Sequence, residues 1–145
     1  MSPPFRISRR VDFADTDMAG IIHFSNYFRY MESVEVAFLR ARGLSVSMPW
    51  GEDKIGFPRV SATCDFLHPV RFEDVVDIEV RVERVGRKSV TYTFDFAHKG
   101  KLVAKGRLSA VCCRIRPEAH ELESIDIPED IRKRLLGAEC NAPEA

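Results

Sequence analysis

Two aspartates separated by one residue, Asp15 and Asp17, stand between a short alternating segment and a long amphipathic one. Aspartate and the nearby Gly20 favour a loop at this point. A loop carboxylate can attack an activated carbonyl or take a proton from water. A predicted helix begins near Phe24, and its first backbone N–H groups can stabilise an oxyanion. The spacing alone favours an Asx turn with no chemistry, and hydrolysis of an electrophilic carbonyl compound is the alternative.

Motifs of other enzyme classes are missing from the sequence. There is no GxSxG, no dinucleotide-binding GxGxxG and no Cys-His arrangement suggested by spacing. The histidines lack the spacing of metal ligands, so we expect no metal site; they are His23, His68, His98 and His120. The cysteines form no CxxC pair, so we expect reduced thiols; they are Cys64, Cys112, Cys113 and Cys140.

The length and the hydrophobic fraction of 45% predict one domain over residues 1–145, with a frayed tail at 137–145. The 22 basic residues equal the 22 acidic ones, which gives no reason to expect a nucleic-acid or membrane partner. The N-terminus lacks the apolar core of a signal peptide, and no apolar run reaches the about 20 residues that span a bilayer. We therefore expect a cytoplasmic protein.

The elements that must position the aspartates follow from periodicity. A strand is expected over residues 5–13, a helix from residue 27 to Gly43 with Ser25 or Asn26 as its cap, and a loop over residues 44–58. Further strands are expected near residues 60–66, 76–82, 90–96 and 102–115, with a hairpin turn at Lys99 and Gly100 and a short helix from Pro128. This order predicts an α+β domain, an antiparallel sheet with the long helix on one face. Its remaining apolar surface predicts at least a dimer.

Residues 11–28, VDFADTDMAGIIHFSNYF, resemble the signature of the 4-hydroxybenzoyl-CoA thioesterases and Tol-Pal-associated acyl-CoA thioesterases. In that group a DxD loop, a glycine and an Asn-Tyr pair lead into the long helix. A looser likeness extends through LRARG at 39–43, HPVRFED at 68–74 and GRKS at 86–89. The resemblance implies a hotdog fold, in which a five-stranded antiparallel sheet wraps around one helix. It also implies active sites at a dimer interface, in a homodimer or homotetramer.

The resemblance also assigns roles within the loop. It implies that Asp17 is the catalytic carboxylate, that Asp15 supports it, and that the thioester carbonyl rests on the Phe24 amide. His23 stands where many relatives carry an aromatic residue. It can orient a water or contact the acyl group, and a hydrogen-bonded polar side chain is the alternative. Asn26 is first interpreted as structural, through a helix cap or a contact to the loop.

The CoA phosphates would find Arg87, Lys88 and Ser89 in the GRKS segment, where relatives meet the pantetheine and phosphates; a solvated β-turn is the alternative. Arg59 and Arg71 are weaker phosphate candidates, with surface salt bridges as the alternative. CoA is here part of the substrate, and no separate cofactor is expected.

The predicted function is hydrolysis of a short-chain or aromatic acyl-CoA to a free acid and CoA, with Asp17 as nucleophile or general base. One alternative is a module that only binds acyl-CoA or an acyl carrier protein. Another is a thioester dehydratase or isomerase that uses His23 with Asp17. Five aromatic residues can line an acyl pocket: Phe24, Tyr27, Phe28, Trp50 and Phe57. Tyr27 is first interpreted as structural.

Overall fold

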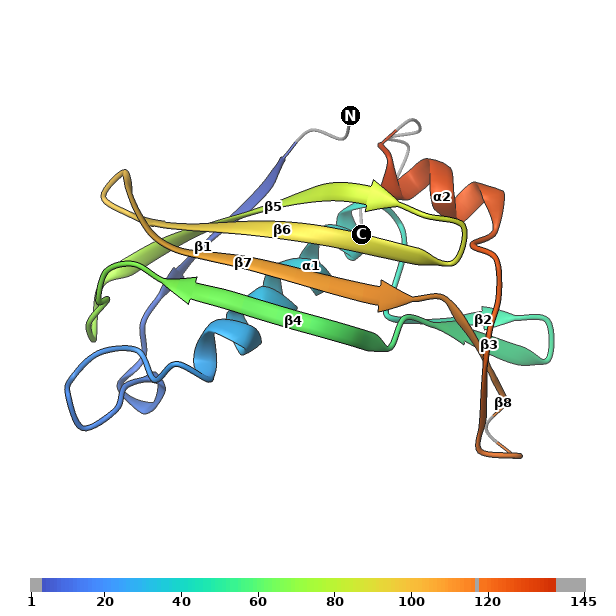
Figure 1. Cartoon of the computed structure of the whole chain (residues 1–145), viewed down its shortest axis with the longest axis horizontal. Helices are drawn as coiled ribbons and strands as arrows, with labels where there is room; N and C mark the ends of the chain where they lie inside the picture. The colour runs from blue at the N-terminus through green and yellow to red at the C-terminus, as the bar shows by residue number, and fades with distance from the viewer. Residues whose placement is uncertain (1–3, 117, 138–145) are drawn as a thin grey trace.

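The computed structural model describes residues 4–116 and 118–137. One long helix lies against a five-stranded antiparallel sheet with the order β1-β5-β6-β7-β4 (Figure 1). In chain order the elements are β1 (Phe5–Arg10), the 3-10 helix η1 (Phe13–Asp15), α1 (Asn26–Ala41), β2 (Ser47–Trp50), β3 (Asp53–Gly56), β4 (Arg59–Phe66), β5 (Val75–Val85), β6 (Ser89–His98), β7 (Lys101–Val111), β8 (Cys113–Arg116), β9 (Glu121–Ser124) and α2 (Glu129–Leu135). The predicted α+β class and the long central helix are confirmed.

Helix α1 buries one face against the sheet because its apolar residues recur at three- and four-residue steps. The side chains of this face that are at most 1% exposed include Tyr30, Met31, Val34 and Phe38. The sheet supplies alternate residues of its strands to the same core, among them Ile78, Val80, Phe94 and Phe96. Gly43, with φ of 71°, follows the helix in the left-handed conformation that commonly ends one, as predicted.

The main hairpin also follows the prediction. Strands β6 and β7 are joined at Lys99 and Gly100, whose φ angles of 50° and 78° suit a tight two-residue turn. Alternate residues of both strands then point into the core. The four strands expected between residues 60 and 115 are present within a few residues of their predicted bounds.

A second, four-stranded sheet of order β2-β3-β8-β9 corrects the prediction for two segments. The segment expected to be a loop over 44–58 contains the hairpin of β2 and β3, which turns at Gly51 with φ of 61°. The strand expected to run to residue 115 stops at Val111, and β8 pairs with β3 in the other sheet. The first strand likewise ends at Arg10 instead of Phe13, where η1 begins.

Strand β4 forms one edge of the main sheet. Within the described ranges it pairs with β7 alone, so its other side has no strand beside it. Every residue of β4 except Cys64 is exposed, and Val60 is 64% exposed at a register shift between Arg59 and Ser61. The edge is therefore long, mostly uncharged and open.

Some expectations fall on residues that the structure does not describe. Cys140 and nearly all of the predicted frayed tail lie outside the described residues.

Cys64, Cys112 and Cys113 are free thiols. The single domain over residues 1–145 remains a prediction. No helix in the described ranges is both long enough and apolar enough to cross a membrane.

Candidate active site

The loop between η1 and α1 is closed by its own backbone. The Asp17 amide donates to the Ile21 carbonyl at 2.8 Å, and the Gly20 amide donates to the Asp17 carbonyl at 3.0 Å. Gly20 has φ of 81°, which a residue with a side chain rarely adopts. Isolated bridges tie Thr16 to Ile22 and Ile21 to Arg71. The position of Asp17 is thus fixed by a tight turn.

The two aspartates of this loop have different partners. One Asp17 oxygen, Oδ1, accepts hydrogen bonds from the amides of Ala19 at 2.8 Å and Ile21 at 3.4 Å. Its other oxygen has no hydrogen-bond partner among the described residues. Asp15 instead accepts a hydrogen bond from the Tyr30 hydroxyl at 2.7 Å, and its carboxylate lies 3.9 Å from the Arg9 guanidinium. Asp15 is bound to the body of the protein, while Asp17 retains an open oxygen.

The start of α1 is attached to the same loop. The Asn26 side-chain amide donates to the Asp15 carbonyl at 2.8 Å, and the His23 amide donates to that carbonyl at 2.8 Å. Neither Ser25 nor Asn26 makes a side-chain cap. Asn26 therefore holds the loop, one of the two structural roles expected for it. The Phe24 amide has no hydrogen-bond acceptor in residues 4–116 and 118–137, so one donor remains available at the helix start.

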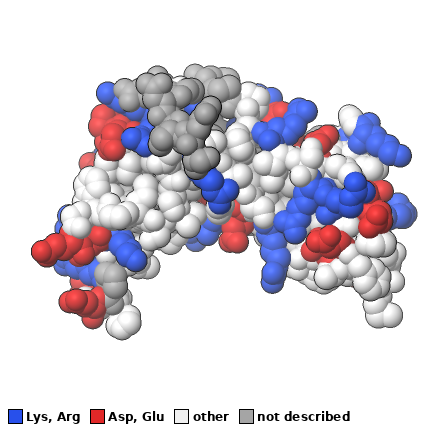
Figure 2. Space-filling model, turned by 180° about the vertical axis from the view of Figure 1, so that it is seen from behind, with Lys and Arg blue, Asp and Glu red and all other residues white. Residues whose placement is uncertain are grey.

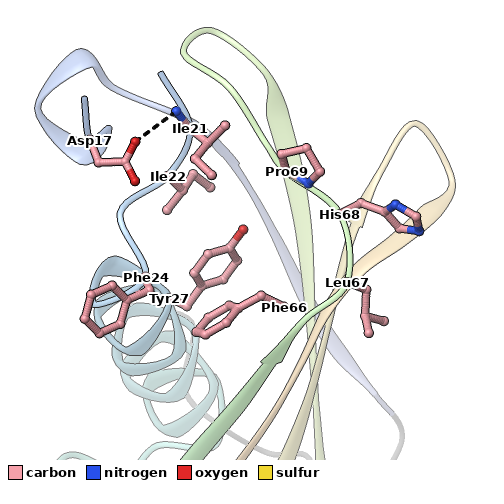
Figure 3. A pocket seen from close by; sticks show the side chains of 9 residues that line it. All are labelled: Asp17, Ile21, Ile22, Phe24, Tyr27, Phe66, Leu67, His68 and Pro69. Carbon is pink, nitrogen blue, oxygen red and sulfur yellow. Dashed lines mark hydrogen bonds between the residues drawn. The ribbon is translucent and has the colours of Figure 1, made fainter. Parts of the chain in front are cut away.

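A pocket of about 290 Å³ opens at this helix start. Figure 3 shows the side chains around it, drawn from the loop, from α1 and from the end of β4. Its lining residues are Asp17, Ile21, Ile22, Phe24, Tyr27, Phe66, Leu67, His68 and Pro69. Most of them are apolar, so the pocket suits an apolar group whose reactive end lies beside the Asp17 carboxylate.

His23 is next to this pocket and does not line it. Its Nδ1 atom lies 2.7 Å from the Ser25 hydroxyl and accepts the Ser25 amide at 3.2 Å. Its ring stacks on Phe24 with 4.7 Å between ring centroids. These contacts agree with the reading of His23 as a hydrogen-bonded polar side chain at the helix start.

The basic turn expected to meet CoA lies at the opposite end of the sheet from the loop that joins β1 to α1 (Figure 1). It joins β5 to β6, and the Arg132 side chain of α2 donates to the Gly86 carbonyl at 2.8 Å. Arg87 lies 3.3 Å from Asp126. In a single chain, then, Arg87, Lys88 and Ser89 do not lie beside the pocket.

The weaker phosphate candidates have different surroundings. The Arg59 guanidinium pairs with Glu35, a carboxylate only 1% exposed on α1, and lies 3.7 Å from Glu32. Burial raises the pKa of Glu35, and Arg59 opposes this shift. Arg71 is exposed and takes part in the bridge that ties the loop to the sheet. Arg59 therefore has a structural partner.

Charges of both signs are interspersed over the face that Figure 2 shows, with basic side chains gathered on one half. Over the described ranges, no three His, Cys, Asp or Glu side chains gather into a possible metal site.

The sequence did not predict most of the pocket residues that lie at the end of β4. Phe66 ends β4, and Leu67, His68 and Pro69 follow it, about 50 residues after Asp17. Of the five aromatic residues expected, Phe24 and Tyr27 line the pocket, whereas Phe28, Trp50 and Phe57 do not. The alternation of apolar and polar residues in β4, which directs Phe66 toward α1, is the signal that could have identified this residue.

The fold and this site define a class. A sequence profile described as the thioesterase-like superfamily matches residues 11–135, and the chain belongs to that superfamily. The prediction of a thioester hydrolase is confirmed for this class.

Particular relatives support the same class. A protein of Aquifex aeolicus (strain VF5), provisionally named an esterase, is 33% identical and covers 91% of this chain and 98% of its own. The 4-hydroxybenzoyl-CoA thioesterase of Pseudomonas sp. (strain CBS-3) is 25% identical over 90% of this chain and 96% of its own. A solved structure of 4-hydroxybenzoyl-CoA thioesterase, an aspartate-to-asparagine mutant complexed with 4-hydroxybenzoyl-CoA, has a TM-score of 0.80 and 25% identity over 91% of this chain and 98% of that one. These likenesses confirm the hotdog fold.

Proposed function

We propose that the protein hydrolyses an acyl-CoA with Asp17 as its catalytic carboxylate and the Phe24 amide as oxyanion donor. One observation carries the proposal: an open carboxylate oxygen and an unpartnered amide, within the described residues, border one apolar pocket at a helix start. The positive end of the α1 dipole favours negative charge at this point. The carbonyl oxygen of the thioester would rest on the Phe24 amide.

The chemistry needs few groups because a thioester is already electrophilic. Asp17 either attacks the carbonyl carbon, giving a mixed anhydride that water then hydrolyses, or takes a proton from the water that attacks. In both routes the C–S bond breaks, and the thiolate leaves as CoA and takes up a proton. Water supplies the second oxygen of the acid directly, or it replaces an Asp17 oxygen that leaves with the acid when the anhydride opens at the Asp17 carbon. Negative charge develops on the carbonyl oxygen, where the amide stabilises it.

The acyl group would occupy the apolar part of the pocket. A volume of about 290 Å³ is near the lower limit of about 300 Å³ for pockets that hold whole ligands. It therefore suits a monocyclic or short acyl group, with the CoA moiety bound outside it. Relatives named for 4-hydroxybenzoyl-CoA and 1,4-dihydroxy-2-naphthoyl-CoA favour an aromatic acyl group over a short aliphatic one.

CoA binding would involve a second copy of the chain. Ser89 pairs with Val111, and Arg59 pairs with Ala110, so the basic turn lies toward the Arg59 end of β4, while the pocket lies at its Phe66 end. Antiparallel pairing of two β4 edges brings the Arg59 end of one copy beside the Phe66 end of the other. Arg87, Lys88 and Ser89 of one copy would then approach the pocket of its partner.

A test on purified protein would follow free thiol and acid from a panel of aromatic and short aliphatic acyl-CoAs. We expect catalytic release of both products from at least one aromatic acyl-CoA. Tight binding without thiol release would instead identify a binding module. An enoyl thioester as product would identify a dehydratase, for which His23, held by Ser25, offers no support.

The same assay separates the two routes. After several turnovers in ¹⁸O-water, a nucleophilic Asp17 whose anhydride water opens at the Asp17 carbon carries ¹⁸O, which mass spectrometry of the peptide detects. A general base leaves the peptide unlabelled.

A further inference from the structure

The Tyr27 hydroxyl is a polar group of the pocket that the proposed hydrolysis does not use. The Tyr27 side chain is 4% exposed, and its hydroxyl has no hydrogen-bond partner among the residues that the structure describes. In Figure 3 the ring rises from α1 and directs its hydroxyl into the space between Ile22 and Pro69. The hydroxyl thus faces the open pocket, where a bound group can exchange a hydrogen bond with it.

The orientation of Tyr27 is fixed by its neighbours. Its ring packs against Phe66 with 5.0 Å between ring centroids and against Phe96 with 5.4 Å. These two rings come from strands on opposite sides of β7, so the phenol has little freedom to rotate away. The hydroxyl therefore remains directed toward the pocket.

Tyr30 provides a contrast on the same helix. Its hydroxyl donates to the Asp15 carboxylate at 2.7 Å, and its side chain is fully buried. The Tyr30 oxygen thus has a structural function that the Tyr27 oxygen lacks.

The Tyr27 hydroxyl stays protonated in any ordinary assay. Burial, with a smaller contribution from Cys64, raises the pKa of Tyr27 to about 12. The group can therefore donate a hydrogen bond and accept one, and it cannot serve as a base near neutral pH.

We propose that the Tyr27 hydroxyl binds an oxygen substituent on the acyl group, so that the pocket selects oxygenated acyl groups over their unsubstituted parents. This inference rests on the proposed function. In Figure 3, Ile22 lies between Asp17 and the Tyr27 hydroxyl. An acyl group whose carbonyl lies beside Asp17 therefore extends past Ile22 and meets Tyr27 with its far end. The surrounding wall is mostly apolar, and the exposed His68 ring is turned away from the Tyr27 hydroxyl in Figure 3. Tyr27 is therefore the polar group that such a far end meets.

The test compares Tyr27→Phe with the wild type on matched substrates. The probes are benzoyl-CoA with its three monohydroxy isomers, and butanoyl-CoA with 3-hydroxybutanoyl-CoA. In the wild type, kcat/KM should be higher for at least one hydroxylated member than for its parent. In Tyr27→Phe this selectivity ratio should fall about tenfold, the effect of losing one well-formed hydrogen bond. Tyr30→Phe, the matched control, should leave the ratio within about twofold because its hydroxyl faces Asp15.

Each other outcome overturns the inference. If the ratio is unchanged in Tyr27→Phe, or if the wild type prefers every unsubstituted parent, Tyr27 does not select the substrate. Thiol release in the same assays would leave the proposed function intact. A wild type that releases no thiol from any acyl-CoA rejects the proposed function and this inference with it. Thermal melting of both variants checks that they fold.

Discussion

Asp15 and Asp17 carry the same side chain two positions apart, yet their carboxylates have different surroundings. Asp15 accepts the Tyr30 hydroxyl and the Asp12 amide and lies near Arg9, so it joins the loop to α1 and β1. Asp17 accepts amides of its own turn through one oxygen and borders the pocket. The choice between them as candidate catalytic group, first based on resemblance, now has a geometric basis.

Replacing Tyr30 with Phe tests the structural function of Asp15. The substitution removes the 2.7 Å hydrogen bond to a charged acceptor and keeps the ring packing. We expect the free energy of unfolding in urea to fall by about 1.5–3 kcal/mol. Tyr27→Phe, which removes no hydrogen bond among the described residues, should change it by less than about 0.5 kcal/mol. Equal losses in the two variants would contradict this division.

Among single residues, those of the loop were predictable from the sequence, whereas the pocket residues far from them in the sequence were not. Asp17 and Phe24 are close in sequence, so a loop before a helix was enough to bring them together. Phe66 and Pro69 reach the same pocket only because the edge strand β4 ends beside the start of α1. The basic turn at Arg87 was expected near the reaction, and in one chain it lies at the far end of the sheet.

Among the elements, α1 and β7 approach each other closely at Gly106. A Cβ atom built on Gly106 would lie 2.7 Å from the sulfur of Met31, which is closer than real contacts allow. The glycine therefore permits the distance between helix and sheet that the core requires.

Gly106→Ala tests this contact. We expect the free energy of unfolding to fall by about 1–3 kcal/mol, because the Met31 side chain must leave its position to admit a methyl group. Lys105→Ala, on the exposed face of the same strand, should change it by less than about 0.5 kcal/mol. Urea denaturation measures both. A Gly106→Ala protein as stable as the wild type would mean that Met31 repacks without cost.

The second sheet explains where element prediction failed. Strands β2, β3, β8 and β9 have four residues each, which is too short for an alternation to be distinguished from a loop. Strand β3 also pairs with β8, about 60 residues later, and such pairing leaves no local signal. The long helix and the longer strands of the main sheet were predictable because each carries its own period.

For the whole molecule, the open edge of β4 is the main unexplained surface. An exposed strand of eight residues offers unpaired backbone groups, and proteins seldom leave such an edge uncovered. Apolar side chains at Val60 and Phe66 stand at its two ends, 64% and 48% exposed. A second copy of the chain would cover both.

Light scattering after gel filtration should therefore give at least twice the chain mass of 16.5 kDa. Val60→Lys, which adds a charge to the edge, should shift the protein toward the monomer and lower thioester hydrolysis with it. Leu122→Lys is the matched control, because Leu122 is 63% exposed on the other sheet. A wild-type monomer with full activity would show that one chain holds the complete site.

The most direct test of the central claim is the rate of Asp17→Asn on the best acyl-CoA substrate. This change keeps the size of the side chain and an oxygen for the turn, and it removes the carboxylate. We predict that kcat falls by about 10²–10⁴-fold, while the melting temperature and acyl-CoA binding stay near those of the wild type. A folded Asp17→Asn protein that hydrolyses the substrate at the wild-type rate would contradict the account.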